Sequence, residues 1–202
     1  MHKAIKRLID IIGSISGLII LFPLFLILTI ILKSDGGSAF FGHRRIGYKN
    51  KKFTCWKFRT MHVGSEKVLE QYLRKNIKAK KEWDKKFKLE NDPRITKIGK
   101  FLRKTSLDEF PQLWNVLKGD MSLVGPRPIV KEEQKYYKDK IHAYFSVKPG
   151  LTGLWQISGR SNIGYDERIK LDLRYIKNNS ILKDFLIILK TIKVVLSGHG
   201  AK

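Results

Sequence analysis

Cysteine is nearly absent from the sequence. The 202 residues contain only Cys55, so no disulfide bond can form within the chain, and a reducing compartment fits this composition. The five histidines are scattered and show no ligand spacing, which argues against a structural zinc site. The length is that of about one domain, and with 43% hydrophobic residues the chain can still form an ordinary core.

Acidic residues are also scarce. The chain has 18 Asp and Glu against 41 Lys and Arg, which gives a formal net charge of +23. A charge of this size predicts a polyanionic neighbour, and nucleic acid, an anionic membrane and a phosphorylated substrate all qualify. The charge alone does not choose among these three.

Charged residues are missing altogether from residues 11–32. These 22 apolar or small residues are enough to cross a hydrocarbon core of about 30 Å, as a straight transmembrane helix would. A secretory signal is disfavoured because its apolar core usually has only about 7–15 residues. Pro23 lies at the centre and basic residues flank both ends, so the positive-inside rule places both ends in the cytoplasm. We therefore expect residues 1–33 to form a re-entrant hairpin that is broken at Pro23, with an ion pair between Arg7 and Asp10.

Residues 34–202 are predicted to form one catalytic domain, which makes the whole chain α+β and mainly helical. The expected elements are strands over 39–41 and 52–58 joined as a hairpin, a solvated helical segment over 65–89, and helices over 95–104, from 108 to about 117, and over 181–196. The last of these has one apolar face and one lysine-rich face. It fits a helix packed on the core and an amphipathic helix at the membrane interface equally well.

Two adjacent carboxylates, Asp108 and Glu109, interrupt this basic chain. Ser106 and Glu109 have the spacing of a capping box, and Pro111 excludes a helix interior, so both acids are predicted at or just before a first helical turn. Free backbone N–H groups at that position favour anions and keep a carboxylate ionised. From these residues alone, the acids could also do no more than begin a helix.

The second half of the chain contains stiff and glycine-rich loops. In Gly125-Pro126-Arg127-Pro128 the two prolines fix their own φ angles, so Arg127 is expected on a rigid arch. Lys148-Pro149-Gly150 is a turn, and the following segment, which includes Gly153, Trp155 and Arg160, suits close approach of a ligand to the backbone. Each loop taken singly could be an ordinary tight turn.

The ordered motifs resemble those of a known family, the bacterial sugar transferases, which are monotopic polyprenyl-phosphate phosphoglycosyl transferases. The resemblance also covers the apolar N-terminal segment, although the family often has Ser-Pro where this chain has Phe22-Pro23. The 65–89 segment is closest to the undecaprenyl-phosphate galactose or glucose phosphotransferase branch. The motifs are Lys57-Phe58-Arg59-Thr60-Met61, Asn91-Asp92-Pro93-Arg94-Ile95-Thr96, Ser106-Leu107-Asp108-Glu109, Gly119-Asp120-Met121-Ser122-Leu123-Val124-Gly125-Pro126-Arg127-Pro128 and Lys148-Pro149-Gly150-Leu151-Thr152-Gly153.

The resemblance implies transfer of a sugar phosphate, a hexose 1-phosphate in that branch, from a UDP-sugar to undecaprenyl phosphate with release of UMP. This would be the first membrane step of exopolysaccharide, O-antigen or capsule-type glycan assembly. It implies that Asp108 is the nucleophile, that Glu109 helps to hold Mg²⁺, and that the enzyme works at the cytoplasmic face of the bacterial inner membrane with both termini in the cytoplasm. Anionic inner-membrane lipid is an expected partner, nucleic acid is not, and a homodimer is compatible with the resemblance.

The chemistry of the side chains agrees with these roles. Attack on a diphosphate brings an anion to an anion, so Mg²⁺ held by Asp108 and Glu109 together with nearby cations must neutralise charge. An aspartate with an ordinary pKa of about 3.9 is ionised at neutral pH and needs no general base. The candidate phosphate contacts are Arg127 and Arg103, then Lys57 and Arg59, and Arg160 from the glycine-rich segment.

Two other classes of protein compete with the enzyme. A membrane-tethered nucleic-acid-binding module is suggested by the charge and the four tryptophans, and it would bind nucleic acid in a salt-sensitive manner without turnover. A structural membrane-surface protein would use its acids only to begin a helix, and Asp108→Asn would then be silent.

Overall fold

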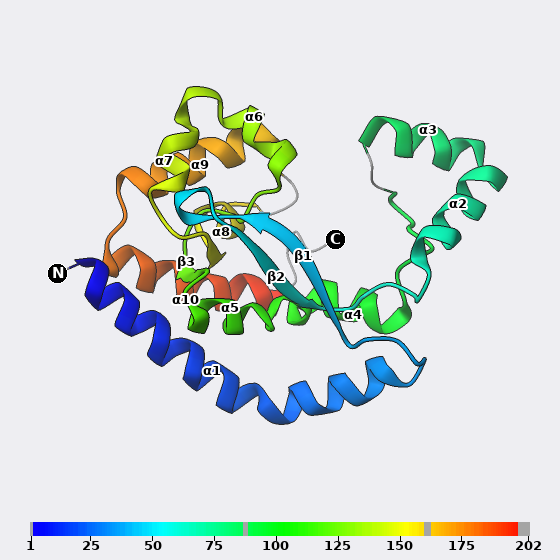
Figure 1. Cartoon of the computed structure of the whole chain (residues 1–202), viewed down its shortest axis with the longest axis horizontal. Helices are drawn as coiled ribbons and strands as arrows, with labels where there is room; N and C mark the ends of the chain where they lie inside the picture. The colour runs from blue at the N-terminus through cyan, green and yellow to red at the C-terminus, as the bar shows by residue number, and fades with distance from the viewer. Residues whose placement is uncertain (1, 87–88, 160–162, 198–202) are drawn as a thin grey trace.

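The computed structural model describes residues 2–86, 89–159 and 163–197. Within them the chain is mainly helical with two small sheets, which confirms the predicted α+β class (Figure 1). The helices of two turns or more are α1 (His2–Lys33), α2 (Ser65–Lys75), α3 (Ile77–Lys86), α4 (Lys97–Thr105), α5 (Gln112–Lys118), α9 (Tyr165–Lys177) and α10 (Ile181–Ser197). The shorter ones are α6 (Gln134–Tyr137), α7 (Ile141–Phe145), α8 (Leu154–Ile157) and the 3₁₀ turns η1 (Tyr48–Asn50), η2 (Leu107–Glu109), η3 (Lys131–Glu133) and η4 (Lys138–Lys140).

The two sheets are both two-stranded. β1 (Phe40–Ile46) and β2 (Lys52–Phe58) form the predicted antiparallel hairpin, with His43 opposite Cys55 and Phe41 opposite Lys57. β1 is longer than the predicted 39–41, because the polar residues His43, Arg44 and Arg45 continue the strand. β3 (Ser122–Val124) and β4 (Gly150–Thr152) pair in parallel and bring the two glycine-rich loops side by side.

α1 is a single helix that continues through Pro23, so the predicted break into two helical halves is wrong. Proline removes only the one backbone hydrogen bond that its missing N–H would make, and the turns on either side remain helical. The helix is bowed and runs along one side of the molecule (Figure 1). It is long and apolar enough to cross a membrane.

The N-terminal end of α1 is fixed to the rest of the chain by polar contacts. Arg7 donates to Val116 O and Leu117 O, each at 2.7 Å, and so binds carbonyls at the C-terminal end of α5. Asp10 is buried, and its Oδ1 accepts from Ser122 Oγ at 2.9 Å and from Leu123 N at 2.8 Å. The predicted Arg7–Asp10 ion pair is therefore wrong, because each side chain finds partners of complementary polarity on the folded domain.

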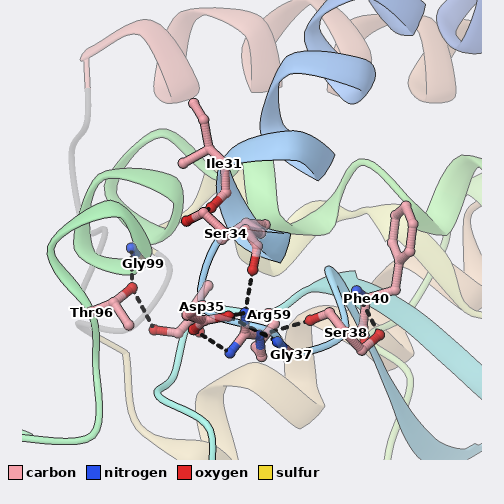
Figure 2. Close-up of polar contacts among 11 residues, drawn as sticks. Ile31, Ser34, Asp35, Gly37, Ser38, Phe40, Arg59, Thr96 and Gly99 are labelled. Atoms are coloured by element: carbon pink, nitrogen blue, oxygen red, sulfur yellow. Dashed lines mark hydrogen bonds and ion pairs between the residues drawn. The ribbon is translucent and has the colours of Figure 1, made fainter.

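The C-terminal end of α1 contacts the same domain. Leu28 and Leu32 are buried in one core cluster with Phe58 and Leu102, which come from β2 and α4. Just beyond the helix, Arg59 donates to Asp35 through both of its terminal nitrogens, at 2.6 and 2.8 Å (Figure 2). Both ends of the long apolar helix are thus attached to one body.

The helices at the periphery match the prediction in part. α2 and α3 form the predicted helical segment and project away from the other elements (Figure 1). α10 packs on the core, one of the two alternatives for residues 181–196, and the interface alternative stays a prediction. Asp184 and Ile187 are buried against the core, while apolar side chains on its other side are exposed, including Leu182 at 69% and Phe185 at 57%.

Candidate active site

Asp108 lies in the short η2 turn between α4 and α5. Ser106 ends α4 with a positive φ of 58°, and Pro111 precedes the first residue of α5, so the chain turns sharply and the acids sit between two helices. η2 has no side-chain capping hydrogen bond, so the predicted capping box is wrong. Ser106 has the left-handed backbone conformation that is typical of a residue ending a helix. An N-cap residue needs an extended backbone instead. Asp108 is only 8% exposed.

Lys57 connects both acids to the β1–β2 hairpin. Its Nζ lies 2.6 Å from Glu109 Oε1 and 3.7 Å from Asp108 Oδ2. The buried Asn115 of α5 holds the helix against β2, because its Nδ2 donates to Thr54 O at 2.7 Å and its Oδ1 accepts from Trp56 N at 3.0 Å. The lysine and the two carboxylates, separated by about fifty residues in sequence, thus form one group.

Burial changes the acidity of this group. It raises the pKa of Asp108 to about 6, although the Lys57 and Arg103 cations oppose the rise. Burial alone would lower the pKa of Lys57, but the Glu109 and Asp108 carboxylates raise it above its usual value, so the ammonium stays charged. The prediction of an ordinary pKa for Asp108 is therefore wrong, because desolvation disfavours the carboxylate. At pH 7 to 8 the side chain is still mostly ionised.

A nucleophilic Asp108 should give the rate an acid limb. Only the carboxylate can attack, so kcat/KM should fall about tenfold per pH unit below a pH of about 6. Lys57→Gln removes a cation that lowers the pKa of Asp108 and should move the limb to higher pH, whereas Lys52→Gln, an exposed change on the same strand, should not. The measurement is the pH profile of kcat/KM for the transfer reaction that the sequence resemblance implies. A rate that stays flat down to pH 4.5 would contradict the assignment.

Arg103 lies beside the acid pair. Its Nε donates to Thr60 Oγ1 at 3.0 Å. Burial lowers the pKa of its guanidinium, while the Asp108 and Asp92 carboxylates raise it. Of the predicted cations in the described part of the chain, Arg103 and Lys57 are the two that the structure brings to Asp108.

The arch that carries Arg127 is held by backbone hydrogen bonds between the two glycine-rich loops. Gly125 N donates to Thr152 O at 2.9 Å, and Gly150 N donates to Pro126 O at 2.8 Å. A Cβ atom on Gly150 would lie 2.0 Å from Gly125 N, and one on Gly153 would lie 2.1 Å from Gly125 O. These glycines let one backbone approach another, which gives Gly150 and Gly153 a structural role, while approach of a ligand to this segment stays a prediction.

Arg127 faces Trp155, which the sequence analysis named in the glycine-rich segment, and three residues that sequence reasoning missed, Arg168, His43 and Arg45. Its guanidinium lies 5.3 Å from the centre of the Trp155 ring, and Arg168 lies 4.5 Å from the same ring. Arg127 also lowers the pKa of His43 and Arg45, after the larger effect of burial on each. His43 and Arg45 alternate on β1, so they share the face of the hairpin that carries Lys57. The predicted strand ended at residue 41, and a prediction that extended it to residue 46 would have included His43 and Arg45.

The remaining predicted cations behave differently. Arg59 donates to Ser38 O at 2.7 Å and to Leu32 O besides its two bonds to Asp35, so it ties the end of α1 to the following loop (Figure 2). Because the guanidinium N–H groups of Arg59 already donate to protein oxygens, a structural role is favoured over the predicted phosphate contact. Arg160 lies outside the described residues.

The acid pair is compatible with magnesium that is shared with a substrate. No group of three or more His, Cys, Asp or Glu side chains that could hold a metal occurs among the described residues. Mg²⁺ is commonly bound by one or two carboxylates together with substrate phosphates and water, and Asp108 and Glu109 could supply the two carboxylates.

Comparison with known proteins agrees with the motifs and the geometry. The model of the bacterial sugar transferase family matches residues 1–198. The chain is 53% identical to the undecaprenyl-phosphate galactose phosphotransferase of Salmonella typhimurium and 51% identical to the UDP-galactose-lipid carrier transferase of Erwinia amylovora, in each case over 98% of this chain and 42% of the relative. It is 47% identical to the exopolysaccharide production protein ExoY of Rhizobium meliloti, over 97% of this chain and 87% of the relative.

The chain thus spans less than half of the two transferases and most of ExoY. In all three the match extends over nearly this entire chain, including the apolar helix and the acid pair. The chain belongs to the bacterial sugar transferase family.

Proposed function

We propose that this protein transfers a sugar phosphate, in the simplest case a hexose 1-phosphate, from a UDP-sugar to undecaprenyl phosphate with release of UMP. The names of the relatives support the donor, the lipid carrier and a role in exopolysaccharide synthesis. The observation that carries the proposal is the buried Asp108 carboxylate, with Lys57 at 3.7 Å and Arg103 beside it. A mostly ionised acid among cations is suited to attack an anionic phosphorus centre.

The proposed reaction has two steps. A carboxylate oxygen of Asp108 attacks the phosphorus that carries the sugar, the bond to the bridging oxygen breaks, and UMP leaves with the electron pair. A phosphate oxygen of undecaprenyl phosphate then attacks the same phosphorus, and the bond to Asp108 breaks to regenerate the carboxylate. Lys57 and Arg103 offset the charge that the two anions bring together.

Magnesium is part of the proposal. Asp108 and Glu109 would hold the ion, which would neutralise phosphate charge and polarise the phosphorus centre. In the structure Glu109 pairs with Lys57 at 2.6 Å. This lysine would therefore hold the Glu109 carboxylate in position for a metal ion that also binds the substrate phosphates.

The attachment of α1 supports the proposed membrane topology. A straight helix that crosses a bilayer has its ends on opposite sides, yet both ends of α1 contact the same folded domain. We place this domain, and with it both termini, at the cytoplasmic face of the inner membrane, with the bowed helix in one leaflet. Basic residues at both ends would then meet anionic lipid. The nucleic-acid-binding alternative is not supported, because family membership accounts for the basic charge through a membrane and phosphorylated substrates.

A panel of UDP-sugars tests the proposed activity directly. The protein, purified in detergent, is incubated with each UDP-sugar, undecaprenyl phosphate and Mg²⁺, and released UMP is measured. One or a few hexose donors should support continued release of UMP, and this steady-state release should require undecaprenyl phosphate. Turnover with none of them, or release of UDP instead of UMP, would contradict phosphosugar transfer.

Glu109→Gln should weaken the dependence on magnesium. The change keeps the shape of the side chain but removes one of two carboxylates that would hold the ion, so half-maximal activity should need about 10- to 100-fold more Mg²⁺. Turnover at saturating metal should also fall. The control is Glu66→Gln, an exposed change on α2 that should leave the magnesium curve in place. An unchanged curve for Glu109→Gln would remove Glu109 from the metal site.

A further inference from the structure

Two arginines contact the same indole ring. The ring of Trp155 on α8 is contacted by Arg127 of the arch and by Arg168 of α9. Arg168 also lies 5.4 Å from the ring of Tyr165. Arg45 shares the hairpin face of Lys57 and donates to Pro128 O at 3.3 Å, so the arch that carries Arg127 borders the hairpin face that carries the lysine of the acid pair.

Three hydrogen-bond donors in this stack are buried without a partner. They are Arg127 Nε, Arg168 Nε and Trp155 Nε1, and Gln156 next to the tryptophan adds an unpartnered acceptor, Oε1. Buried N–H groups in folded proteins are nearly always paired, because an unpaired one loses its bonds to water without replacement. Three such donors around one ring fit a ligand that is rich in acceptor oxygens.

The charges around the stack point to the same kind of ligand. Burial and the nearby Arg127 lower the pKa of Arg168, and Arg45 experiences the same two effects. Two acids face these cations. Glu133 lies 3.6 Å from Arg45, and burial raises the pKa of Asp172 to about 7, so Asp172 is only partly ionised at neutral pH. Among the described residues, the three half-buried arginines therefore carry more charge than these two acids offset, and an anion that joined them would restore the balance.

We infer that Arg168, Arg127 and the Trp155 N–H bind the phosphate of the leaving UMP. This inference rests on the proposed function. When Asp108 forms its bond to the sugar-bearing phosphorus, the electron pair of the broken P–O bond goes to the UMP phosphate, which gains one negative charge. The guanidinium of Arg168, in addition to that of Arg127, stabilises this charge where it develops. Arg168 is thereby assigned a catalytic role as a contact to the leaving group.

Binding of UMP to the purified full chain in detergent tests the inference without turnover. Calorimetric titrations compare UMP with uridine, which lacks the phosphate. Arg168→Gln should weaken UMP binding about 10- to 100-fold and leave uridine binding unchanged. Trp155→Phe keeps an aromatic ring under both arginines but removes Nε1–H, and it should weaken UMP binding about 3- to 10-fold. The matched control is Arg174→Gln, which removes the same charge from an exposed position of α9 and should bind UMP like the unmodified protein.

The outcomes separate this inference from the proposed function. Unchanged UMP affinity in Arg168→Gln and in Trp155→Phe overturns the subsite, even if the unmodified protein turns over UDP-sugars. Unmodified protein that binds UMP through Arg168 but transfers no sugar phosphate supports the subsite and contradicts the proposed function. A titration with a short-chain polyprenyl phosphate covers the other phosphate source. If Arg168→Gln loses that ligand and keeps UMP, the site belongs to the acceptor and the inference is overturned.

Discussion

Asp108→Asn is expected to reduce sugar-phosphate transfer by a factor of about 10⁴ or more, because an amide cannot form the covalent bond that links the two half-reactions. Incubation of the unmodified protein with a UDP-sugar and Mg²⁺, without undecaprenyl phosphate, should add the mass of one sugar phosphate to the chain. Intact-mass and peptide analysis after rapid quenching should locate this adduct on Asp108. The variant should show no adduct.

The same variant should keep its fold. Burial raises the pKa of Asp108 to about 6, above its ordinary value, so the ionised side chain costs the folded state free energy at neutral pH. The asparagine removes this cost, and Lys57 keeps Glu109 as its partner at 2.6 Å. The melting temperature should therefore be equal to or higher than that of the unmodified protein. Asp139→Asn, an exposed change, serves as the control with full activity. An adduct on any other residue, or ternary-complex kinetics with no adduct, would remove Asp108 from the nucleophile position.

Both ends of α1 are expected on the cytoplasmic side of the membrane. Single cysteines at Ala4 and Ser34, each in a Cys55→Ser background, report on the two ends without changing a charged residue, and both positions are exposed. In intact cells neither should react with a membrane-impermeant thiol reagent, and both should react after lysis. Each cysteine should be either fully protected or fully labelled, because the two positions lie at opposite ends of the apolar helix.

A transmembrane helix would give a different pattern. One of the two cysteines would then react in intact cells while the other stayed protected. That result would also require one end of α1 to leave the domain, and so to break either the Asp10 contacts with Ser122 and Leu123 or the packing of Leu28 and Leu32. Labelling of both cysteines only after lysis, together with retained activity, would support the bowed arrangement.

Sequence reasoning found the elements whose causes are local. The apolar run of residues 11–32 predicts a helical membrane segment by composition, and α1 covers this run, although without the predicted break at Pro23. Gly119 ends α5 with a positive φ of 90°, as a glycine after the last helical turn predicts. The order of the motifs identified the family, which the family model confirms. One local rule failed because distant partners replaced the local one: Arg7 donates to Val116 O and Leu117 O and not to Asp10.

Lys57 and Arg59 show the limit of sequence reasoning at the site. The two cations lie two residues apart and looked equivalent in the sequence, yet Lys57 binds Glu109 while Arg59 binds Asp35. β2 ends at Phe58, so Arg59 lies beyond the strand and next to the end of α1. Which acid each cation meets depends on how segments far apart in the chain pack together.

The family, the apolar run, the adjacent carboxylates and the excess of positive charge can all be read from the order of the residues, because each depends on residue identity and short-range spacing. Three features required the folded chain: both ends of α1 contact one domain, burial raises the pKa of Asp108 to about 6, and Arg168 shares the Trp155 ring with Arg127. Desolvation and the distance between charges arise from packing. Residues separated by forty or more positions come together only when the chain has folded.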